Sequence, residues 1–107
     1  MTKIYLATPY SHWCPLVRWL RFWRVTRMAV KLMKDNYIVY SPITHTHPMD
    51  VICGIHEPWE HWEKYDTPFV IWADWLVVYR QRGWEKSVGV AAEIAIAKKL
   101  GKPVKYI

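Results

Sequence analysis

Short apolar runs alternate with longer amphipathic stretches along this chain. Four of the runs have the length and composition of strands in a buried sheet: Lys3–Thr8, Tyr37–Tyr40, Trp75–Tyr79 and Pro103–Ile107. Helical stretches follow the first run, from about Pro15 to Lys34, and precede the last, from Val88 to Leu100 with Gly101 as the cap. The pattern therefore predicts strands that alternate with helices.

The segment between the second and third strands has a less regular pattern. Residues 41–48 are predicted to form a loop, and residues 49–65 a loop with a short helix. Another helix is expected to start at Asp66, because the following Thr67-Pro68 places proline where the first helical turn favours it.

This order of elements is typical of an α/β fold. We expect one doubly wound, flavodoxin-like or Rossmann-like domain over residues 1–107, with a small parallel sheet in the order 2-1-3-4. Ligands of such sheets bind beyond the carboxyl ends of the strands, where the strand order reverses. The loops at residues 9–12 and 41–48 and the helix start at Ser87 lie at that edge, so we expect the binding site there.

Composition and charge narrow the class of protein. The formal charge of +6 favours anionic partners, and no apolar stretch is long and uncharged enough to span a bilayer. The first residues lack the features of a signal peptide, and Cys14 and Cys53 fit no paired framework. We therefore expect a cytoplasmic protein with reduced thiols and no membrane partner.

The expected first helix combines many large apolar side chains with many basic ones. Its apolar side includes Trp19, Trp23 and Met33, and six Arg and Lys residues spread over the other side. Such a basic side is usually a solvated face; the alternative is nucleic-acid binding, which we do not expect. Because the chain is short and this helix is apolar beyond one stripe, we expect a homo-oligomer.

One carboxylate stands out in the last helix. Glu93 lies in the apolar run VGVAAEIAIA, where an ionised carboxylate is costly unless it is paired or used. It is too far from the helix start to act as a cap, whereas Ser87 is placed to be the N-cap. Ser87, Gly89 and the positive end of the helix dipole suit a phosphate group. The alternative is an ordinary serine cap with a glutamate that faces solvent.

These motifs resemble the nucleoside 2-deoxyribosyltransferase superfamily, including its deoxynucleoside 5'-monophosphate N-glycosidases, over nearly the whole chain. The opening Tyr5-Leu6-Ala7 is similar to the family's first motif, and Asp66 and Asp74 stand eight residues apart before the third strand, as in the family. Ser87, Gly89 and Glu93 match the Ser-x-Gly-x-x-x-Glu motif of the monophosphate hydrolases. Gly101-Lys102-Pro103-Val104 resembles the family's last strand.

The resemblance implies a nucleoside deoxyribosyltransferase-like domain that cleaves or transfers at the N-glycosidic bond of (deoxy)nucleoside 5'-monophosphates. It implies that Glu93 is the nucleophile that forms a glycosyl-enzyme and that Tyr5 contacts this glutamate. It also implies that Asp66 is the acid that binds or protonates the base, that Ser87 lies at the phosphate, and that no cofactor is needed. The loop Thr8–His12 departs from the family, because it lacks the glycines and arginine usual there. Two interpretations stay open: such an enzyme, or a non-catalytic nucleotide-binding or sensing module. For Asp66 the alternative is a plain helix-start residue.

Other polar and aromatic side chains are candidates for substrate binding. They are Tyr10, Ser11, His45, His47 and Asp74. On extended backbone His45 and His47 would point the same way, toward an anion or a base.

Two further groups have alternative interpretations. A zinc site can be drawn from His45 and His47 with Cys53, His56 and His61, but the spacing matches no known site, so no metal is expected. Trp59, Trp62 and Tyr65 recur about every three residues, which usually indicates core packing and less often stacking on a base.

Overall fold

The sheet has the predicted topology. In the computed structural model, which describes residues 1–55 and 57–107, four parallel strands lie in the order β2-β1-β3-β4. The strands are β1 (Lys3–Ala7), β2 (Ile38–Tyr40), β3 (Trp75–Val78) and β4 (Val104–Tyr106). The chain is therefore an α/β protein whose strand order reverses between β1 and β3, as expected for a doubly wound sheet.

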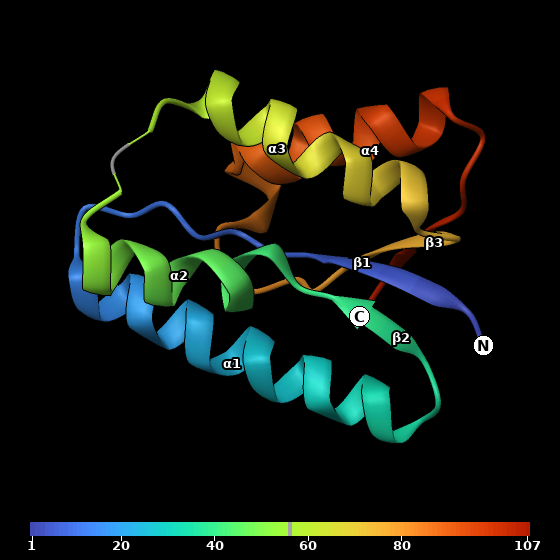
Figure 1. Cartoon of the computed structure of the whole chain (residues 1–107), viewed down its shortest axis with the longest axis horizontal. Helices are drawn as coiled ribbons and strands as arrows, with labels where there is room; N and C mark the ends of the chain where they lie inside the picture. Colours follow the sequence, from blue (N-terminus) through green and yellow to red (C-terminus); the bar gives the residue numbers. More distant parts are fainter. Residues whose placement is uncertain (56) are drawn as a thin grey trace.

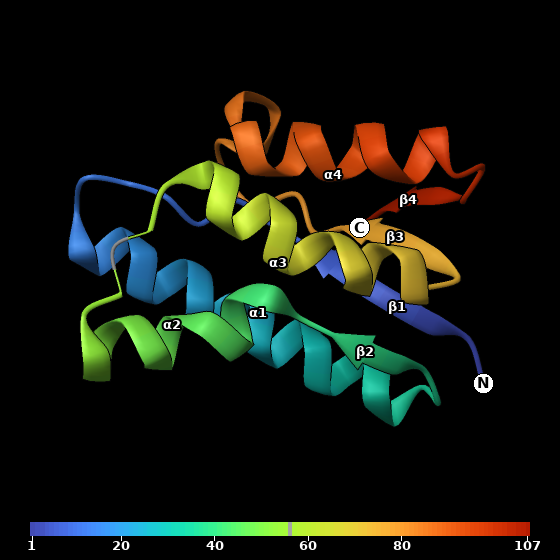
Figure 2. The same ribbon diagram turned by 45° about the horizontal axis from the view of Figure 1, so that its top comes forward.

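Helices cover both faces of this sheet (Figure 1). They are α1 (Pro15–Lys34), α2 (Pro42–Cys53), α3 (Trp59–Trp72) and α4 (Val88–Lys99), with a short 3-10 turn, η1 (Trp84–Lys86), before α4. Figures 1 and 2 show α1 and α2 on one side of the strands and α3 and α4 on the other. None of the helices in residues 1–55 and 57–107 is both long and apolar enough to cross a membrane.

The alternation of side chains along β1 divides the core in two. Ile4 and Leu6 pack with Val25 of α1. Tyr5 and Ala7 point to the other face, where they pack with buried residues of α3 and α4. Because successive strand residues face opposite ways, this register turns the Tyr5 side chain toward both later helices.

The segment predicted as a loop after the second strand is a helix. The Ser41 side chain caps α2 by accepting a hydrogen bond from the Thr44 backbone N–H at 3.4 Å, and Pro42 occupies the first turn. The prediction failed because Ser-Pro is a helix start as well as a turn signal. His45 and His47 therefore lie on a helix, where residues two apart point in different directions.

The helix expected to start at Asp66 starts seven residues earlier. Asp66 lies within α3, and Pro68 is inside that helix rather than at its first position. An internal proline costs about 3 kcal/mol of helix stability, because it removes one backbone donor. Burial of Val70 and packing of Phe69 against the core oppose that cost. Tertiary packing thus overrides the local signal that Pro68 gives.

Candidate functional site

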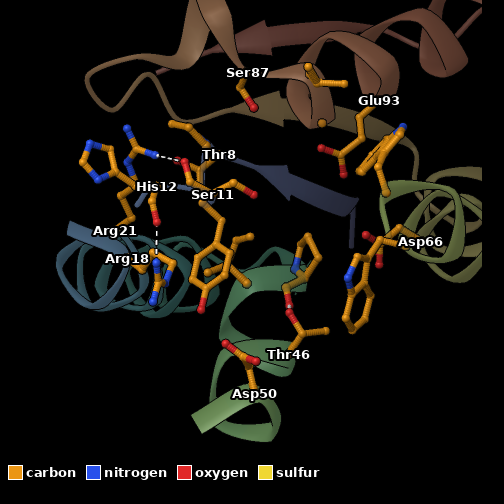
Figure 3. Close-up of a pocket in the computed structure, with 18 of the residues that line it drawn as sticks. Thr8, Ser11, His12, Arg18, Arg21, Thr46, Asp50, Asp66, Ser87 and Glu93 are labelled. Carbon is orange, nitrogen blue, oxygen red and sulfur yellow. Dashed lines mark hydrogen bonds between the residues drawn. The ribbon is translucent and has the colours of Figure 1, made fainter. Parts of the chain in front are cut away.

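A cleft of about 1230 Å³ opens at the carboxyl edge of β1 and β3, where the fold predicts a ligand. Its walls come from the loop after β1 and from helices α1, α2, α3 and α4 (Figure 3). Six of the expected site residues line it: Tyr10, Ser11, Asp66, Ser87, Gly89 and Glu93. The fold therefore gathers residues from distant parts of the sequence at one edge of the sheet.

Glu93 lies buried on the inner side of α4. The hydroxyl of Tyr5, which is fully buried in β1, donates a hydrogen bond to Glu93 Oε2. Burial raises the pKa of Glu93 to about 8; the Tyr5 hydroxyl acts to lower it, and the charge of Asp66 raises it further. The glutamate therefore neither caps the helix nor faces solvent, and the free site holds it largely protonated at neutral pH.

Asp66 supplies a second buried carboxyl from α3. Its Oδ1 atom has no hydrogen-bond partner within the described part of the chain. Burial raises the pKa of Asp66 to about 6, while the Tyr5 hydroxyl and His61 act to lower it. Figure 3 shows Asp66 and Glu93 at the same end of the cleft. Two carboxyls of different pKa in one cleft are typical of sites that divide acid and base roles.

Tyr5 stays a neutral donor beside these carboxyls. Its pKa is raised well above the ordinary value, first by burial and then by the charges of Glu93 and Asp66. A tyrosine that keeps its proton can donate to an ionised carboxylate over the whole physiological range. Tyr5 is thus suited to stabilise the charged form of Glu93.

The start of α4 forms another wall of the cleft. Ser87 is the N-cap, and its Oγ accepts a hydrogen bond from the Val90 backbone N–H at 3.2 Å. A hydroxyl that accepts in this way keeps its own proton free to donate to an anion. Ser87 and the positive end of the α4 dipole therefore face the cleft as the sequence predicted.

Gly89 makes room for a neighbouring side chain. A Cβ atom at this position would lie 3.3 Å from the Trp59 ring, which extends from the first residue of α3. Trp59 and Trp62 both line the cleft, whereas the Tyr65 hydroxyl forms a hydrogen bond with His45. Trp59 and Trp62 are therefore available to contact a ligand. From the sequence pattern, core packing was the more usual role for such residues.

Basic side chains line the other end of the cleft. Arg21 donates from Nη1 to the Ser11 carbonyl at 2.9 Å and from Nη2 to the Arg82 carbonyl at 3.0 Å. Arg18 donates to the His12 carbonyl, and Lys86 also lines the cleft. Figure 3 shows Arg18 and Arg21 on the opposite side of the cleft from Asp66 and Glu93.

Sequence reasoning missed these two arginines. The sequence predicts a solvated face of the helix for them, but they lie near its start and turn toward the loop after β1. Arg24 and Arg27 continue the same spacing of three residues, so the sequence carries no signal that singles out Arg18 and Arg21.

The two candidate histidines do not line the cleft. His45 hydrogen-bonds the Tyr65 hydroxyl at 2.9 Å and stacks on that ring. His47 is buried, stacks on Phe22 and accepts or donates a hydrogen bond at 2.6 Å with the Tyr10 hydroxyl. Burial lowers the pKa of His47. Their expected direct contact with a ligand is therefore not supported, and His47 instead positions Tyr10.

Asp74 lies at the wrong edge of the sheet for a substrate-binding residue. It immediately precedes β3 and accepts a hydrogen bond at 2.9 Å from the backbone N–H of Lys3, at the start of β1. Residues that precede parallel strands share the amino edge, opposite the cleft. The structure therefore gives Asp74 a role in joining two strands.

The zinc site considered from the sequence has no support from the residues that the structure describes. No group of three His, Cys, Asp or Glu side chains in residues 1–55 and 57–107 is placed to hold a metal ion. One of the candidate ligands, His56, lies outside the described residues.

Comparison with known proteins identifies a family for this chain. No curated protein matches the chain. A family model described as "Domain of unknown function (DUF1937)" matches residues 2–107, which is nearly the whole sequence. By this match the chain belongs to the DUF1937 family.

Proposed function

We propose that this protein cleaves the N-glycosidic bond of deoxynucleoside 5'-monophosphates through a covalent glycosyl-enzyme on Glu93. The observation that carries the proposal is the hydrogen bond from Tyr5 to Glu93, buried at one end of a cleft that also holds Asp66. The resemblance of Tyr5, Asp66 and the Ser87-Gly89-Glu93 motif to the deoxyribosyltransferase superfamily supports the same reaction.

Glu93 acts as the nucleophile in the first step. Its carboxylate attacks C1' of the sugar, and the electron pair of the breaking C1'–N bond leaves with the base. Positive charge develops on the sugar as the bond breaks, and an ionised Glu93 is stabilised most when that charge is beside it. The Tyr5 hydroxyl lowers the pKa of Glu93 against the effect of burial. In the complex, the positive charge that develops on the sugar further favours the ionised form of Glu93.

Asp66 moves the proton in both steps. In its protonated form it gives a proton to the departing base, which leaves neutral, and it becomes a carboxylate. That carboxylate then accepts a proton from the water that attacks C1' and releases Glu93. In the free site the pKa of Glu93, about 8, is higher than that of Asp66, about 6, so the reaction requires the proton to pass from Glu93 to Asp66 when the nucleotide binds.

The two ends of the cleft suit the two ends of a nucleotide. Arg18 and Arg21 give the end opposite the carboxyls a positive charge, and Ser87 lies at the start of α4. An anionic 5'-phosphate is favoured beside guanidinium groups and a helix N-terminus. Trp59 and Trp62 offer aromatic rings on which a base can stack.

The same cleft suits a second function, a nucleotide-binding or sensing module without catalysis. The observation that favours it is the raised pKa of Glu93, since a protonated carboxyl binds a neutral group but does not attack. In that case the protein would bind the nucleotide and leave it intact.

A single assay separates the two functions. The protein is incubated with each deoxynucleoside and its 5'-monophosphate, and free base is measured by chromatography. We expect base release from a monophosphate that Glu93→Gln reduces by at least a thousandfold, while the exposed-site control Glu60→Gln stays at the wild-type rate. Nucleotide binding by both variants without base release from the wild type would support the binding module instead.

A further inference from the structure

The outer side of α1 carries an apolar stripe. Figure 1 shows α1 as the outermost helix on its side of the sheet. Five large apolar residues of this helix are exposed: Leu16 63%, Trp19 47%, Trp23 44%, Val30 45% and Met33 58%. At roughly 100° per residue they fall within about one third of the helix circumference. Trp13, just before the helix, is also exposed, at 87%.

A row of basic residues runs beside this stripe. Arg24, Arg27, Lys31 and Lys34 are exposed, and α1 contains no acidic residue. Arg27 lies over the Trp23 ring at 4.8 Å, and Trp23 stacks with Trp19 at 6.4 Å between ring centroids. A hollow of about 680 Å³ between the basic side chains and Trp23 is large enough for a small anionic group. Aromatic, aliphatic and basic side chains thus share one face.

The charge of this face selects an anionic partner. A symmetric contact between two copies through α1 would bring two rows of like charges together, with no acid on either helix to pair with them. The phosphates of a nucleic acid would pair with the basic side chains, and its bases could stack on the tryptophans. It has few apolar groups, however, that could contact Leu16, Val30 and Met33. A lipid surface with anionic headgroups accommodates both the aliphatic stripe and the basic row.

From this combination we propose that α1 docks on the surface of an anionic lipid membrane. The helix lies in the plane of the membrane, with its apolar stripe at the headgroup and acyl boundary and its basic row on the phosphates. The sequence-based expectation of no membrane partner rested on the lack of a spanning segment, and surface docking needs none. The inference is independent of the proposed chemistry, because the stripe and its basic row lie outside the cleft.

Vesicle binding by the full chain tests the proposal. The probes are vesicles of phosphatidylcholine alone and of phosphatidylcholine with about 30% phosphatidylglycerol, and binding is measured by co-sedimentation. We expect at least tenfold tighter binding to the anionic vesicles, weakened by salt and accompanied by a blue shift of tryptophan emission.

Two sets of substitutions locate the surface. The triple variant Arg24→Gln, Arg27→Gln and Lys31→Gln should bind anionic vesicles at least tenfold more weakly. Lys64→Gln, Lys98→Gln and Lys99→Gln remove the same charge from exposed sites elsewhere and should change binding less than twofold. The charge-neutral change Trp19→Gln with Trp23→Gln should abolish the blue shift, with circular dichroism used to confirm folding.

Three outcomes would overturn the proposal. One is equal binding to both kinds of vesicle, or equal loss in the two triple variants. Another is a stable dimer in light scattering that the Trp19→Gln, Trp23→Gln variant dissociates, because α1 would then be an interface between copies. The third is binding of a single-stranded oligonucleotide through α1 without binding to anionic vesicles.

Discussion

The hydroxyl of Tyr5 donates a hydrogen bond to Glu93, a residue 88 positions further along the chain. The contact joins the first strand to the last helix, and both side chains are buried. It fixes the position of the carboxylate and favours its charged form against the cost of burial.

Loss of the Tyr5 donor should shift the pH dependence of base release. Without the hydroxyl, burial and Asp66 alone act on Glu93, and both raise its pKa. Tyr5→Phe should therefore move the rising limb of the pH–rate profile to higher pH and reduce the rate at pH 7 by about tenfold, less than Glu93→Gln does. The profile is measured between pH 5 and 9. An unchanged limb with a lower plateau would mean that Tyr5 acts on geometry alone.

The buried Glu93 should make stability depend on pH. The folded protein holds the Glu93 proton up to about pH 8, whereas the unfolded chain releases it near the ordinary value of 4.5. The raised pKa therefore stabilises the folded state at low pH, and this contribution is lost as pH rises through that window. Between pH 5 and 8.5 the melting temperature of Glu93→Gln should rise relative to the wild type, by on the order of 5 °C. Parallel melting curves for the two proteins would contradict the burial of an ionisable group.

The close approach of Trp59 to Gly89 should appear as energetic coupling. Alanine is favoured over glycine inside a helix by about 1 kcal/mol, but the new Cβ would lie 3.3 Å from the Trp59 ring. Gly89→Ala should therefore gain less stability in the wild type than in a Trp59→Ala background. Urea unfolding of the single and double variants measures the difference. Additive changes would show that the ring moves away freely.

A negative charge at the start of α4 should oppose a phosphate. Aspartate is as good an N-cap as serine, so Ser87→Asp should keep α4 folded. The added charge should weaken binding of a deoxynucleoside monophosphate at least tenfold and binding of the nucleoside less than twofold. Calorimetry with both ligands provides the internal control. Equal losses would place the phosphate at another part of the cleft.

The fold could be predicted from the sequence because its apolar runs are short and separated. The runs around Tyr5, Val39, Val77 and Lys105 became the four parallel strands in the expected order. The helix over Pro15–Lys34 was predicted with the bounds that the structure has, since Pro15 starts it and Asp35-Asn36 ends it. The failures lie at Pro42 and Pro68, where the same residue is compatible with a turn, a helix start or a helix interior.

The candidate site was predictable only where a motif carried it. The sequence indicates Glu93 because burial of a lone ionised carboxylate in an apolar run is costly. The resemblance to the deoxyribosyltransferase superfamily connects it with Tyr5 and Asp66. Sequence could not place Trp59 against Gly89, because that contact depends on the packing of α3 on α4. It also could not separate Arg18 and Arg21 from the other basic residues of α1, because only the loop after β1 distinguishes them.

A covalent adduct on Glu93 would be the most direct evidence for the proposed reaction. Protein quenched during turnover should show, by mass spectrometry, a deoxyribosyl phosphate on the peptide that contains Glu93. The adduct should accumulate in Asp66→Asn when the substrate carries a leaving group that departs without protonation. With such a substrate, formation of the glycosyl-enzyme needs no proton from residue 66, so the amide of the variant does not hinder it. Hydrolysis of the adduct is slowed because the amide cannot accept the proton of the attacking water.

Asp66→Asn and Glu93→Gln thus give opposite results with that substrate. The first should release one equivalent of leaving group in a burst and then stall with the adduct in place; the second should release none. Asp74→Asn is the matched control, because that carboxylate lies at the opposite edge of the sheet and should leave turnover unchanged. A burst without an adduct on the Glu93 peptide would assign the nucleophile elsewhere. Steady turnover by Asp66→Asn would mean that another group activates the water, and the division of roles between the two carboxyls would be wrong.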